Sequence, residues 1–167
     1  MKHILFQVPI WKENIDVSKI QLKSSNFKPS FLSGVLSTFN GKNIISEEGS
    51  KYLGTKLKEI LSKDFEIKQI TVHHIWKNVY QNDFQDTHNH AGCHFSFVAY
   101  EKIQKPQTVF FHPARDLIYA SKAETLFIAQ NKFEVVENDL IIFPSYLNHM
   151  VSLTKDALTI SGNFDIE

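Results

Sequence analysis

Two histidines and an acid alternate along one short stretch of the chain, at Asp86, His88 and His90. Alternate side chains of an extended strand point to the same face, so two imidazoles and a carboxylate can share one face here. Imidazole is a common ligand for iron, zinc, copper and nickel. The spacing therefore indicates a metal site, although solvated histidines on a polar strand would give the same pattern.

A third histidine strengthens the interpretation as a metal site. His149 follows an apolar, strand-like run over residues 139–144 and precedes another strand start, which would place it at the mouth of a barrel. We predict that His88, His90 and His149 bind one metal ion and leave open positions for substrate or O₂. Asp86 lies on the same strand face and is an alternative to His90 as a ligand.

Short strands must bring these histidines together. Residues 67 onward alternate between apolar runs and polar turns. Eight or so short strands after a helical part are typical of a jelly roll or barrel, so we predict a mainly β (α+β) double-stranded β-helix. The strands that we expect span residues 67–80, 86–90, 94–101, 107–112, 125–129, 132–136, 139–143, 149–154 and 157–165.

The N-terminal part, residues 1–66, is predicted to hold a strand and helices. A strand is expected over residues 1–11 and a short helix over 16–22, whereas most of 12–45 gives no clear pattern. Leu53, Leu57, Ile60 and Leu61 recur at helical spacing after a capping Ser46, which predicts an amphipathic helix over 47–62.

Composition limits the classes of function. The 167 residues are the size of a single domain, and a 43% hydrophobic content with 14 Phe can fill its core. Zero net charge gives no reason to expect nucleic acid or an anionic membrane as partners. A single cysteine, Cys93, excludes an internal disulfide and fits a reducing compartment, so a cytoplasmic location is expected. An edge strand at residues 3–10 would be open to a second copy, which favours a homodimer.

Several motifs occur in the order seen in one protein family. They lie at residues 4–11, 76–80, 88–100, 111–115, 139–149 and 159–164, and the most specific is Phe-Pro-Ser-x-Leu-x-His over 143–149. On these residues the chain resembles the small Fe(II)/2-oxoglutarate oxygenase-like proteins of bacteria and phages. If a phage encodes it, the cytoplasm would be that of the host.

The resemblance implies a jelly-roll barrel with Fe(II) at one end and 2-oxoglutarate bound to the iron. Such a site would couple oxidative decarboxylation to the oxidation of a substrate, here unknown. Asn78 and Tyr80 lie on a strand whose counterparts in related oxygenases line the cosubstrate pocket. We expect both residues to contact the cosubstrate.

Two departures from the family pattern bear on the cosubstrate. His-x-His replaces the usual His-x-Asp or His-x-Glu. The closing strand has Ala157-Leu158-Thr159 in place of Arg-x-Ser, so Thr159 keeps the hydroxyl and the arginine is missing. Arg115 is the only arginine in the chain and is the candidate to replace it, with Lys77 and Lys155 as alternatives.

Three functions remain open from the sequence. The leading one is an Fe(II)/2-oxoglutarate-dependent dioxygenase. The second is a cupin-like dioxygenase with three histidine ligands that does not use 2-oxoglutarate, which the missing arginine favours. The third is a non-catalytic jelly roll with a binding or structural role.

Overall fold

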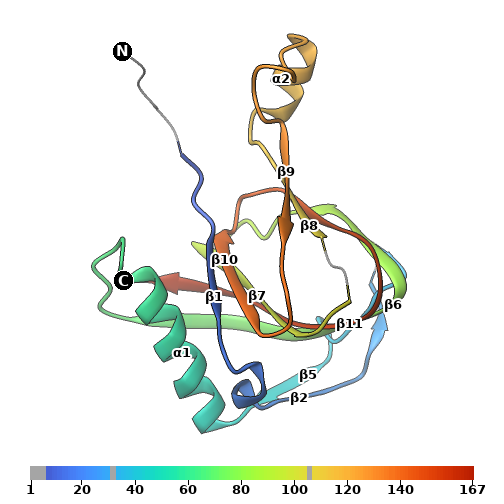
Figure 1. Cartoon of the computed structure of the whole chain (residues 1–167). Helices are drawn as coiled ribbons and strands as arrows, with labels where there is room; N and C mark the ends of the chain where they lie inside the picture. The colour runs from blue at the N-terminus through green and yellow to red at the C-terminus, as the bar shows by residue number, and fades with distance from the viewer. Residues whose placement is uncertain (1–6, 31–32, 105–106) are drawn as a thin grey trace.

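The structure is a computed structural model that describes residues 7–30, 33–104 and 107–167. Antiparallel strands dominate it, with one long helix and two short helical segments (Figure 1). The architecture is the predicted double-stranded β-helix, or jelly roll. In chain order, the elements are β1 (Trp11–Asn14), η1 (Val17–Ile20), β2 (Leu22–Ser25), β3 (Lys28–Pro29), β4 (Leu36–Ser37), β5 (Lys42–Ile45), α1 (Glu47–Leu61), β6 (Ile70–His88), β7 (Phe95–Lys102), β8 (Gln107–Phe111), α2 (Arg115–Ala120), β9 (Gln130–Glu134), β10 (Asp139–Pro144) and β11 (His149–Ile166).

The curved strands β6 and β11 form the framework of the barrel. They pair antiparallel from His88 opposite His149 to Ile70 opposite Ile166. The main sheet has the order β1-β10-β7-β11-β6-β4-β3, and β8 joins it by pairing with β11 and β9. β2 and β5 form a separate two-stranded sheet.

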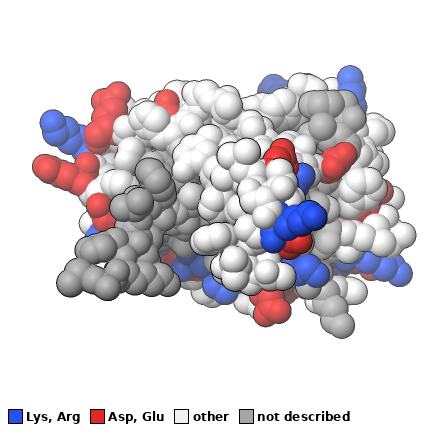
Figure 2. Space-filling view, turned by 90° about the horizontal axis from the view of Figure 1, so that it is seen from above, with Lys and Arg blue, Asp and Glu red and all other residues white. Residues whose placement is uncertain are grey.

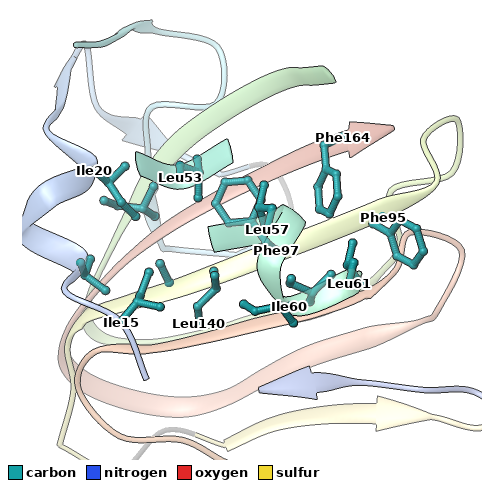
Figure 3. Close-up of a cluster of buried hydrophobic side chains, with 14 of the residues drawn as sticks. Ile15, Ile20, Leu53, Leu57, Ile60, Leu61, Phe95, Phe97, Leu140 and Phe164 are labelled. Carbon is teal, nitrogen blue, oxygen red and sulfur yellow. The ribbon is translucent and has the colours of Figure 1, made fainter. Parts of the chain in front are cut away.

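Helix α1 covers the outer face of the main sheet. Ser46 caps it, because its hydroxyl accepts a hydrogen bond of 2.9 Å from the backbone N–H of Gly49. The predicted apolar face is buried: Leu53, Leu57 and Leu61 pack towards Phe97 and Phe164 of the sheet (Figure 3). The prediction of a helix over 47–62 is therefore confirmed.

Strand β10 joins two cores, because its side chains alternate between the two faces of the sheet. Leu140 and Ile142 belong to the core beneath α1, whereas Ile141 and Phe143 belong to a second core inside the barrel. All four are fully buried, so neither face of the strand is exposed to solvent.

The predicted breaks within the two longest strands are wrong. Residues 67–80 and 86–90 were expected as separate strands, but β6 continues through Gln81 and Asn82, whose side chains are exposed. Likewise 149–154 and 157–165 form the single strand β11, in which Asp156 takes a positive φ of 51°. Polar residues on the outer side of a curved strand resemble a turn in sequence.

Two other predictions fail in the described residues. The strand expected over 1–11 begins only at Trp11; residues 7–10 are irregular, and residues 1–6 lie outside the described part. The strand expected over 125–129 is absent, because the chain turns there after α2 and leaves Leu126, Phe127 and Ile128 exposed. Short apolar runs of this kind predict strands whether or not a neighbour is present to pair with them.

Charges are mixed on the face seen from above. Basic and acidic side chains are scattered there among uncharged ones, in line with the zero net charge of the chain (Figure 2). Among the described residues, no helix is both long and apolar enough to cross a membrane.

Replacing Leu57 by Ala should lower the free energy of unfolding by about 2–5 kcal/mol, because Leu57 is fully buried between α1 and the sheet. Thr55→Ala, on the exposed side of the same helix, is the matched control and should change it by less than about 0.5 kcal/mol. Urea denaturation followed by circular dichroism measures both. Equal stability of the two variants would contradict this packing of α1.

Candidate metal centre

Three histidines meet at one end of the barrel. His88 ends β6 and His149 begins β11, and the register of the two strands places these residues opposite each other. His90 lies two residues beyond β6, where its backbone N–H donates a 2.8 Å hydrogen bond to the carbonyl of Ser145. The ring centroid of His149 lies 4.3 Å from that of His88 and 5.3 Å from that of His90.

Backbone carbonyls orient two of the rings. Nδ1 of His88 lies 2.7 Å from the carbonyl oxygen of Asp86, and Nδ1 of His149 lies 3.0 Å from that of Leu147. A carbonyl oxygen only accepts hydrogen bonds, so each Nδ1 carries the proton and each Nε2 keeps a free lone pair. This second-sphere arrangement is the one that metal-binding histidines commonly have.

Burial keeps the three imidazoles neutral. It is the main cause that lowers the pKa of His90, to about 4, with smaller effects from His88 and His74. Burial also lowers the pKa of His88, and it lowers that of His149 well below the usual range. All three rings can therefore offer a lone pair to a metal at neutral pH.

The donor set fits a transition metal. One ligand nitrogen from each of His88, His90 and His149 can be chosen so that all three lie within 4.8 Å of one another. Asp86 is not part of this group: it is exposed, and its carboxylate accepts a 2.7 Å hydrogen bond from the N–H of Thr87. The structure thus brings the three predicted histidines together and leaves out the alternative carboxylate.

A small cavity inside the barrel adjoins the histidines. Its lining includes the predicted residues Asn78, Tyr80 and Thr159. The free space is about 30 Å³, which is room for one or two water molecules. Sequence reasoning missed Tyr100 and Thr108, which also line it and share a 2.6 Å hydrogen bond between their hydroxyls.

Polar groups of this inner cavity are neutral and incompletely paired. Nδ2 of Asn78 lies 3.4 Å from the hydroxyls of both Thr159 and Ser161, while its buried Oδ1 has no hydrogen-bond partner among the described residues. Burial raises the pKa values of Tyr80 and Tyr100, so both phenols stay protonated. The Tyr80 hydroxyl lies 3.0 Å from Oε1 of Gln85. The cavity therefore offers hydroxyl and amide groups to a ligand.

The candidate cations lie elsewhere, contrary to the expectation for Arg115. Its guanidinium sits on α2, 4.5 Å from the centroid of the Phe111 ring, and its Nε is 3.3 Å from the carboxylate of Asp116. Lys77 pairs with Glu101 at 2.8 Å. None of the described residues that line the inner cavity is a lysine or arginine, so neither these two residues nor Lys155 supplies a positive charge there.

A larger pocket lies next to the inner cavity and is lined by His88 and His90. It has a volume of about 400 Å³ and shares Trp76, Gln85, His88 and His90 with the inner cavity. Its far wall comes from residues 26–30 and 37–40, including Lys28 and Phe39. No clear pattern is visible in the sequence over this stretch, so this wall was not predicted. Trp76 could have been found, because it alternates with Asn78 and Tyr80 along one strand.

Comparison with known proteins shows the fold. No family model matches the chain, and no curated protein matches it by sequence. Among solved structures, an oxidoreductase of the 2OG-Fe(II) oxygenase family from Burkholderia pseudomallei matches with a TM-score of 0.60 and 11% identity, over 89% of this chain and 76% of that chain. A prolyl-4-hydroxylase from Pseudomonas putida matches with a TM-score of 0.59 and 15% identity, over 93% and 91%.

A third similar structure carries a metal and a cosubstrate. HygX from Streptomyces hygroscopicus, solved with nickel and 2-oxoglutarate bound, matches with a TM-score of 0.54 and 8% identity, over 94% of this chain and 82% of that chain. The chain thus has the jelly-roll fold of 2OG-Fe(II) oxygenases, as the sequence motifs predicted. At identities of 8–15%, these structures show a shared fold.

Replacing His149 by Ala should weaken binding of Fe(II) or Ni(II) by about 100-fold or more, because it removes one of three ligands. The exposed His112, which lies outside this group, is the matched control, and His112→Ala should leave the affinity unchanged. Anaerobic isothermal titration calorimetry measures both. Equal affinity in the two variants would show that the metal binds elsewhere.

Proposed function

We propose that the protein is an Fe(II)-dependent oxygenase that uses 2-oxoglutarate as cosubstrate. The observation that carries the proposal is the convergence of three neutral imidazoles beside a small inner cavity, with two of them, His88 and His90, also lining a larger outer pocket. The fold shared with 2OG-Fe(II) oxygenases supports the choice of iron and of this chemistry.

Each part of the site would have a distinct task. His88, His90 and His149 would hold the metal, with Nε2 of His88 and His149 directed by the carbonyls behind their rings. Iron together with 2-oxoglutarate supplies oxidative decarboxylation coupled to the oxidation of a substrate. The outer pocket, with Trp76 and Phe39 in its walls, would admit that substrate to the side of the histidines open to solvent.

The site fits the metal better than it fits 2-oxoglutarate. Hydroxyls of Tyr80 and Thr159 and the amide of Asn78 are the groups that would meet the distal carboxylate. A buried carboxylate without a cationic partner costs several kcal/mol, which hydrogen bonds from neutral donors offset only in part. The small free volume also requires side chains to move. We therefore expect weak binding of 2-oxoglutarate.

Anaerobic addition of Fe(II) and then 2-oxoglutarate tests the proposal. We expect iron to bind and a metal-to-ligand charge-transfer band to appear in the visible spectrum at millimolar 2-oxoglutarate. Succinate formation after admission of O₂ would then confirm turnover. His149→Ala should show neither the band nor succinate, and His112→Ala should show both.

One observation favours a second candidate, a three-histidine dioxygenase that does not use 2-oxoglutarate. The inner cavity, as lined by described residues, lacks a cation for the second carboxylate. Iron binding without a charge-transfer band, even at saturating 2-oxoglutarate, would support this candidate and contradict the first. Absence of iron binding would contradict both and leave a non-catalytic jelly roll.

A further inference from the structure

A second group of metal-ligating side chains lies away from the three histidines. It consists of His73 near the start of β6, Cys93 in the loop before β7, and Asp165 near the end of β11. One ligand atom from each can be chosen so that all three lie within 4.8 Å of one another. The group shares no residue with the candidate metal centre formed by His88, His90 and His149.

Sheet pairing explains why these residues meet. β11 lies between β6 and β7, with Asp165 opposite Thr71 on one side and the adjacent Phe164 opposite Phe95 on the other. Neighbouring strands are about 4.8 Å apart, so side chains from two paired strands and from the loop that leads into a third can converge on one small ion. Two of the three ligands are therefore held by paired strands, which favours a defined geometry.

The backbone already orients the carboxylate of Asp165. Its Oδ1 accepts a 2.7 Å hydrogen bond from the backbone N–H of His94, and its Oδ2 lies 2.7 Å from Nε2 of His73. The backbone N–H of His94 is the main cause that lowers the pKa of Asp165, so the carboxylate is ionised at neutral pH. An ionised carboxylate with one oxygen fixed from behind resembles the second-sphere support of known metal sites.

The donor set determines which metal would bind. Imidazole, thiolate and carboxylate are the three kinds of side chain that bind Zn²⁺, and three protein ligands leave a fourth position for water. A thiolate and a carboxylate together balance the charge of a divalent ion, whereas the three neutral imidazoles of the other site do not. We propose that His73, Cys93 and Asp165 form a second metal site that binds Zn²⁺.

A nucleophilic role for Cys93 fits the structure less well. Burial is the main cause that raises the pKa of the Cys93 thiol, and the nearby carboxylate of Asp165 adds to the shift. Without a metal the thiol is protonated and a poor nucleophile. On binding, Zn²⁺ would displace the thiol proton to solvent as the S–Zn bond forms.

The second site would also restrain the loop that carries a ligand of the first. Cys93 follows His90 by three residues, with Gly92 between them at a positive φ of 114°. A backbone hydrogen bond already holds this loop at His94, whose carbonyl accepts a 3.1 Å hydrogen bond from the N–H of Ser145. Zinc bound by Cys93 would also crosslink the loop to β6 and β11.

Cobalt(II) substitution tests the second site directly, because thiolate ligation gives a sulfur-to-cobalt charge-transfer band in the near ultraviolet. The wild-type chain should bind two Co²⁺ ions and show the band. Cys93→Ser should bind one ion without the band, while circular dichroism confirms that it is folded. Asp165→Asn keeps an oxygen that can accept the hydrogen bond from the N–H of His94. This variant should lower the affinity for Co²⁺ at the site that gives the band by about tenfold or more.

His149→Ala is the matched variant of the other site and should bind one ion with the band intact. This outcome would hold whether or not the protein is an oxygenase, so failure of one proposal is distinguishable from failure of the other. Zn²⁺ added to the cobalt-loaded protein should remove the band. A wild-type protein without the band, or a band that persists in Cys93→Ser, would overturn the proposal.

Discussion

Strands β6 and β11 pair antiparallel along almost their whole length, and their register brings together both groups of metal-ligating side chains. One end of this pair sets His88 opposite His149, and the other sets Asp165 opposite Thr71, beside His73. A slip of one residue in one strand would turn its side chains to the other face of the sheet. Both groups of ligands therefore depend on the same register, although they share no residue.

The inner cavity of the barrel is lined by uncharged side chains, and this has opposite effects on the binding of a metal and of an anion. Burial in these surroundings lowers the pKa values of the three histidines and keeps them available to a metal. The same surroundings oppose the entry of a doubly charged anion, because none of the described residues that line the inner cavity is a lysine or arginine, and Lys77 pairs with Glu101 instead. The property that favours a metal at the three histidines would thus weaken the binding of 2-oxoglutarate.

Sequence reasoning succeeded where a pattern is local. Helix α1 was predicted because its cap and apolar face lie within 16 residues, from Ser46 to Leu61. The spacing of His88 and His90, with the run before His149, also predicted which histidines would meet. It failed where the outcome depends on distant partners. Arg115 lies at the start of α2 against the Phe111 ring and does not line the inner cavity. The group of His73, Cys93 and Asp165 forms only because segments remote in sequence lie side by side.

The wall of the outer pocket joins the barrel along one stretch of β6. β4 pairs with β6 at Leu36 opposite Val79 and Ser37 opposite Asn78. The next two residues of this wall also contact β6, Thr38 through hydrogen bonds with Lys77 and Phe39 through its ring contact with Trp76. Most of that wall comes from residues 26–30 and 37–40, whereas the three histidines come from β6, β11 and the loop after β6. During evolution, the shape of the pocket could therefore change through substitutions in this wall while the three histidines stayed in place. Related chains could in this way admit different molecules beside the same three histidines.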